Sequence, residues 1–112
     1  MKRVIVETPF KGTTLDEQEA NITYARACAH DCLVNHDEAP FLSHLLYTQP
    51  GILDDGIAEE RQLGIDAGLV WGEMAEATIV YTDRGISRGM EYGIENAKKA
   101  KRPIVFRSLG HT

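Results

Sequence analysis

The fold is decided by residues 77–93, which read ATIVYTDRGISRGMEYG. Residues 77–82 are rich in β-branched and apolar side chains and predict a buried strand. Residues 83–86 contain a glycine and predict a tight loop. Ser87 is a favoured N-cap residue, so a helix is expected to begin there with Met90, Ile94 and Ala97 on its inner face. The stretch therefore predicts a strand, a short loop and a helix in direct succession.

The flanking sequence repeats this alternation. Further strands are predicted at 3–7, 39–42 and 103–106, and further helices from about 16 to 35 and from 57 to 76. Asp16 is expected to cap the first of these helices, with Glu19 three residues later. The apolar positions of the second recur at helical spacing and are Leu63, Ala67, Val70, Trp71 and Met74. Strands that alternate with helices predict a parallel sheet with right-handed crossovers and helices on both faces.

Composition limits the class of protein. The chain has 112 residues, 43% of them hydrophobic and 26% charged, which are ordinary globular values that predict one domain over 1–112. No apolar run approaches the length of a membrane-spanning helix, and the N-terminal apolar stretch is too short for a signal peptide, so a cytoplasmic protein is expected. Cys28 and Cys32 are expected to be buried thiols, and neither a metal site nor a cofactor is predicted.

The charge is distributed unevenly along the chain. The net charge is −5, yet residues 84–112 hold seven basic and two acidic residues. Long nucleic acid is not an expected partner, because the basic residues do not form an extended patch that could contact many phosphates. Lys98, Lys99 and Lys101 are expected to complement the C-terminus of their helix. Arg84 and Arg88, beside the glycines and Ser87 at the start of that helix, favour binding of one small anion.

Ligands of parallel α/β sheets bind at the C-terminal ends of the strands, which here selects 8–14, 43–47, 82–91 and 107–112. In these segments Phe10 could stack on a base or cap the core, and Ser87 could hold a phosphate or only cap its helix. Glu91 follows one turn later and could act as nucleophile or base; Asp66 is a second candidate carboxylate. The candidate substrate-binding residues are Thr8, Pro9, Phe10, Gly12, His44, Tyr47, Asp83, Ser87, Arg88 and Gly89.

Several short motifs, in this order, resemble the nucleoside 2-deoxyribosyltransferase-like superfamily and its short nucleotide N-glycosidase members. They are the opening VIVETPF of 4–10, EAN of 19–21, APFLSH of 39–44 and GMEYG of 89–93. The last is similar to the family's Gly-Met-Glu-Leu-Gly. The resemblance implies a small flavodoxin-like or Rossmann-like three-layer sandwich with a four- or five-stranded parallel sheet, and a homodimer or larger homo-oligomer.

The resemblance also implies an activity. A Glu that matches Glu91 would attack C1′ of a nucleoside 5′-monophosphate, release the base and form a glycosyl-enzyme, while Ser87 would help to hold the phosphate. Counted back from Pro103, however, the family's Glu falls near Gly93, which leaves Glu91 or Glu95 as the carboxylate. The sequence therefore predicts a nucleotide N-glycosidase, or alternatively a binding module that holds a nucleotide in the same pocket without cleaving it.

Overall fold

Four parallel strands form one sheet in the computed structural model, which describes residues 1–110. They are β1 (Lys2–Glu7), β2 (Glu38–Phe41), β3 (Ala77–Tyr81) and β4 (Ile104–Arg107), in the order β2-β1-β3-β4. In the central pair, Glu7 at the end of β1 lies opposite Val80 of β3. The parallel sheet is confirmed, with four strands.

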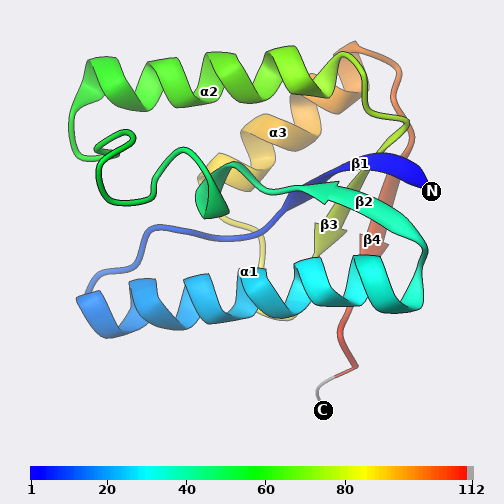
Figure 1. Ribbon diagram of the computed structural model, residues 1–112, viewed down its shortest axis with the longest axis horizontal. Helices are drawn as coiled ribbons and strands as arrows, with labels where there is room; N and C mark the ends of the chain where they lie inside the picture. The colour runs from blue at the N-terminus through cyan, green and yellow to red at the C-terminus, as the bar shows by residue number, and fades with distance from the viewer. Residues whose placement is uncertain (111–112) are drawn as a thin grey trace.

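Helices cover both faces of the sheet, as Figure 1 shows. They are α1 (Leu15–Asn35), α2 (Ala58–Gly72) and α3 (Arg88–Lys99), with a short 3-10 helix η1 (Ser43–Leu45) after β2. The α1 helix lies on one face, while α2 and α3 lie on the other. This arrangement confirms the three-layer α/β sandwich.

Local chemistry fixes where two of the helices begin. Ser87 caps α3 as predicted, because its hydroxyl accepts a hydrogen bond from the Met90 backbone N–H. The predicted Asp16 cap is wrong: Thr14 is the N-cap of α1 and accepts from the N–H of Glu17. Asp16 instead lies inside the first turn, where its negative charge complements the helix dipole.

The core is divided between the two faces of the sheet. Residues of β1 and β3 pack against α1 through the buried Tyr24, Ala25, Cys28 and Cys32. Both cysteines are free and buried, as predicted. On the other face, a smaller cluster joins Val80 to Met90 and Ile94 of α3. The inner face predicted for α3 is therefore confirmed.

The α2 helix departs from its predicted packing. It ends at Gly72, four residues before the predicted end at 76. Its predicted apolar stripe faces outward: Leu63 and Val70 on the helix, and Met74 just beyond its end, are each 59–62% exposed. Neither core cluster contains a residue of α2. No helix among the described residues combines the length and the hydropathy that a membrane crossing requires.

Candidate functional site

The connections that leave β1 and β3 diverge at the C-terminal edge of the sheet. The chain passes from β1 to α1 on one face and from β3 to α3 on the other. Because β1 and β3 are neighbours, a crevice is expected between their ends. This is the topological switch point of the fold, and the loop after β1, η1 and the start of α3 are brought toward it (Figure 1).

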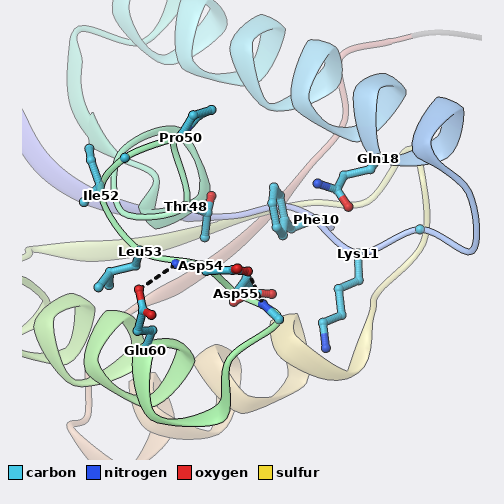
Figure 2. Close-up of a pocket in the computed structure, with 13 residues that line it drawn as sticks. Phe10, Lys11, Gln18, Thr48, Pro50, Ile52, Leu53, Asp54, Asp55 and Glu60 are labelled. Carbon is cyan, nitrogen blue, oxygen red and sulfur yellow. Dashed lines mark hydrogen bonds between the residues drawn. The ribbon is translucent and has the colours of Figure 1, made fainter.

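An open cleft of about 770 Å³ lies beside this edge (Figure 2). Phe10, Lys11 and Gly12 form one wall, and the segment that joins η1 to α2 forms the other. A smaller cavity of about 50 Å³ adjoins it, lined by His44 and Tyr47. The two share Thr48, Leu53, Asp55 and Glu60. The cleft and the smaller cavity together therefore contact two of the predicted segments, 8–14 and 43–47.

The loop after β1 is held in place from two sides. Thr8, Pro9 and Phe10 are buried. The Asn21 side-chain amide donates to the carbonyls of Phe10 and Lys11, at 3.1 and 3.4 Å. Arg84 Nε donates in turn to Asn21 Oδ1 at 2.8 Å. These hydrogen bonds connect the loop after β3 to the loop after β1 and hold this wall of the cleft in place.

His44 lies under this wall as a neutral imidazole. Its ring stacks on Phe10 with the centroids 4.6 Å apart and the planes 10° from parallel. Burial lowers the pKa of His44 to about 4; nearby Asp55 raises it and Arg61 lowers it. Among the described residues, His44 Nδ1 is a buried polar atom without a hydrogen-bond partner. Because buried polar atoms are normally paired, Nδ1 is available to a ligand or a water.

Three of the seven basic residues of 84–112 bond to other parts of the fold. The Arg107 guanidinium forms two hydrogen bonds to Glu38, at 2.8 and 3.0 Å. Arg102 donates to Thr78 Oγ1 and to the Gly72 carbonyl, both at 2.8 Å. With Arg84 bonded to Asn21, the side chain of Arg88 is the exposed arginine nearest Ser87 in sequence. Three of the arginines therefore have structural partners, while Arg88 and the three lysines are exposed.

Asp83 is tied to the C-terminal segment. Its carboxylate accepts hydrogen bonds from the hydroxyls of Tyr24 and Ser108, at 2.6 Å each, and from the Leu109 backbone N–H. Burial acts to raise the pKa of Asp83, but these hydrogen bonds outweigh it and hold the pKa at about 2. Asp83 thus fastens the chain after β4; of the 107–112 segment, residues 111–112 lie outside the described residues.

The remaining predicted site residues do not line either cavity. Ser87, Arg88, Gly89 and Glu91 form the start of α3, with Glu91 exposed. Asp66 is exposed on α2 and accepts a hydrogen bond from Gln62. Tyr47, which does line the smaller cavity, accepts a hydrogen bond from Trp71 Nε1 at 2.8 Å. The structure therefore brings together Phe10, Gly12, His44 and Tyr47, and leaves both candidate carboxylates outside the cavities.

Most of the residues that line the cleft were not among the predicted ones, and neither was Glu7, which lines neither cavity. Lys11, Asp55 and Glu60 line the cleft. Glu7 ends β1 directly before the loop and packs against α3. Period-2 alternation was the available signal for Glu7, since Val4 and Val6 face α1 and Glu7 must face the other side. Within residues 1–110, no group of three His, Cys, Asp or Glu side chains is arranged to hold a metal ion.

Comparisons with known proteins agree with this architecture. A family model described as a domain of unknown function (DUF7768) matches residues 2–107. A search of curated proteins found no match. Among solved structures, a 2-deoxyribosyltransferase from Bacillus psychrosaccharolyticus is similar, with a TM-score of 0.65 over 98% of this chain and 75% of that chain. The two sequences are 17% identical, so the likeness shows a shared fold.

Proposed function

The chain belongs to the DUF7768 family, and for this member we propose a nucleotide-directed N-glycosidase that hydrolyses the base–sugar bond of a nucleoside 5′-monophosphate. The observation that carries the proposal is the cleft between the loop after β1 and the segment that joins η1 to α2, in a fold shared with a 2-deoxyribosyltransferase. Its volume of about 770 Å³ lies within the range of small-molecule sites.

The lining suits the parts of a nucleotide. Phe10 offers an aromatic surface for the base, backed by the His44 ring. The carboxylates of Asp55 and Glu60 accept hydrogen bonds from hydroxyl groups of a sugar. Lys11 reaches across the mouth of the cleft in Figure 2 and supplies a positive charge for a phosphate. In this proposal Thr8, Pro9 and Gly12 shape the wall and Tyr47 supports it.

The start of α3 provides the second anion-binding element. Its first backbone N–H groups are free of intrahelical partners and carry the positive end of the helix dipole. Ser87, Arg88 and Gly89 lie there, and an added Cβ at Gly89 would meet only Ser87 Oγ, at 4.0 Å. We assign the phosphate to the space between this turn and Lys11.

Release of free base from a panel of nucleoside 5′-monophosphates tests the proposal. At least one nucleotide should yield free base and a sugar 5′-phosphate in equal amounts. Chromatography of the reaction mixture measures both products. Phe10→Ala should raise KM about 10-fold or more through loss of stacking area, with Leu33→Ala on the far side of α1 as the control. If calorimetry detects nucleotide binding but no nucleotide releases its base, the proposed glycosidase activity is wrong and the protein is a nucleotide-binding module.

We also propose that the chain forms a homodimer or larger homo-oligomer through α2. Leu63 and Val70 are exposed apolar residues two turns apart on this helix, and the exposed Met74 follows just beyond its end; large exposed apolar patches mark interaction surfaces. Val70→Glu should shift the protein toward monomer in sedimentation velocity. Leu33→Glu, which places the same charge on a half-exposed apolar site of α1, should leave the sedimentation coefficient unchanged. A wild-type protein that sediments as a monomer at all concentrations would contradict the proposal.

A further inference from the structure

The Glu7 carboxyl lies between β1 and α3, at the end of β1 that borders the crevice expected between β1 and β3. It is partly buried, and a Cβ added to Gly93 would overlap both of its oxygens and its Cδ. Gly93 is therefore a glycine because the Glu7 carboxyl occupies the space that any side chain at 93 would need. Within residues 1–110, the carboxyl has an opposing charge in Arg102 but makes no hydrogen bond.

The neighbouring turn of α3 leaves the carboxyl a free approach. Gly89 precedes Gly93 by four residues, so both lie on the same flank of the helix. In front of Gly89, Ser87 Oγ is the one atom within 4 Å of an added Cβ. A ligand group bound at the start of α3 would therefore stand about one helical turn, roughly 5 Å, from Glu7.

Glu91 lies on the other flank. It is two residues from both Gly89 and Gly93, which places it roughly 200° around the helix from them. It is also exposed. The flank of α3 that faces β1 thus carries no carboxylate of its own, and β1 delivers one through Glu7.

An ion pair with Arg102 does not explain why a carboxyl is placed at position 7. The Arg102 guanidinium already donates to Thr78 Oγ1 and to the Gly72 carbonyl. No ion pair joins it to Glu7 among the described residues. The Glu7 carboxyl is therefore partly buried and has no hydrogen-bond partner among the described residues, so it is free to bond to a ligand or to water.

We propose that Glu7 is the acid–base catalyst of the N-glycosidase, an inference that rests on the proposed function. The protonated Glu7 carboxyl donates its proton to a ring nitrogen of the base, and the C1′–N bond breaks with its electron pair passing to the base. A water oxygen then bonds to C1′ of the oxocarbenium-like sugar. The water's proton passes to the Glu7 carboxylate, which restores the acid.

Base release by Glu7→Gln from two kinds of substrate tests this role. From a nucleoside 5′-monophosphate with an ordinary base, release should slow about 100-fold or more. From 7-methylguanosine 5′-monophosphate, whose cationic base leaves without a proton, release should fall less than about 10-fold. Gly93→Ala, which displaces the carboxyl without removing it, should show the same contrast. Glu73→Gln, an exposed carboxylate at the end of α2, is the matched control and should behave as wild type on both substrates.

The outcomes separate the two proposals. If wild type releases base and Glu7→Gln matches it, Glu7 is not the acid and the glycosidase stands. If Glu7→Gln and Gly93→Ala slow both substrates equally, the role of Glu7 is structural and the inference is overturned. If wild type releases base from neither substrate, the proposed function itself fails.

Discussion

Raising the pH from 5 to 8.5 should destabilise the wild-type protein by on the order of 4 kcal/mol more than the Glu7→Gln variant. Burial raises the pKa of Glu7 from 4.5 to about 8, although the Arg102 charge opposes the shift. In the folded state Glu7 keeps its proton up to about pH 8, while in the unfolded chain it loses the proton above pH 4.5. The unfolded state therefore binds fewer protons in this window, and the free energy of unfolding falls as the pH rises.

Urea denaturation of both proteins at several pH values measures this difference. The buried His44, whose pKa of about 4 lies below its ordinary value, destabilises the fold as the pH falls below about 6.5, but it does so equally in both proteins. The difference between the two curves thus isolates Glu7. Parallel curves from pH 5 to pH 8.5 would show that the Glu7 carboxyl ionises normally.

Arg107→Met should lower the free energy of unfolding by about 3–5 kcal/mol. The Arg107 and Glu38 side chains are only 14% and 10% exposed. Hydrogen bonds from Arg107 hold the pKa of Glu38 below its usual range, so Glu38 is charged and would be left unpaired. Arg107 also donates to Tyr81 Oη at 3.2 Å, and this bond would be lost too.

The double variant Arg107→Met, Glu38→Met provides the control for this prediction. It removes both charges, so it should recover most of the stability that the single variant loses. Lys99→Met, at an exposed position of α3, should change the free energy of unfolding by less than about 0.5 kcal/mol. A loss below about 1 kcal/mol for the single variant in thermal or urea unfolding would contradict the importance of the pair.

The order of strands and helices could be predicted because the local signals agree with the packing. Residues 77–81 of the predicted strand 77–82 are buried in β3, and Ser87 caps α3. Periodicity alone could not show whether the apolar stripe predicted for 57–76 faces the core or the surface. The spacing of Leu63, Val70 and Met74 is the same in either case. Thr14 and Asp16 are both acceptable caps, and the choice between them depends on the path of the preceding loop.

The candidate site was harder to predict, because the carboxyl that we propose for it comes from a strand. Glu7 reads in sequence as the polar end of β1, and its enclosure depends on Gly93, which lies 86 positions later. The GMEYG motif predicts Glu91 as the functional carboxylate, yet helix geometry places it on the flank of α3 that faces away from β1. The basic residues after 84 suggested an anion site, but Arg102 and Arg107 are used to join parts of the fold. Only the contacts in the folded structure show which of these residues join parts of the fold and which are left to bind a ligand.

The fate of oxygen from labelled water tests the central claim most directly. Wild-type protein is incubated with a cleaved nucleoside 5′-monophosphate in water enriched in oxygen-18, and the products are analysed by mass spectrometry. Hydrolysis at C1′ predicts one labelled oxygen in the sugar 5′-phosphate, at C1′, and none in the free base or in inorganic phosphate. Labelled inorganic phosphate with the base still attached to its sugar, or no product from any nucleotide, would contradict the account.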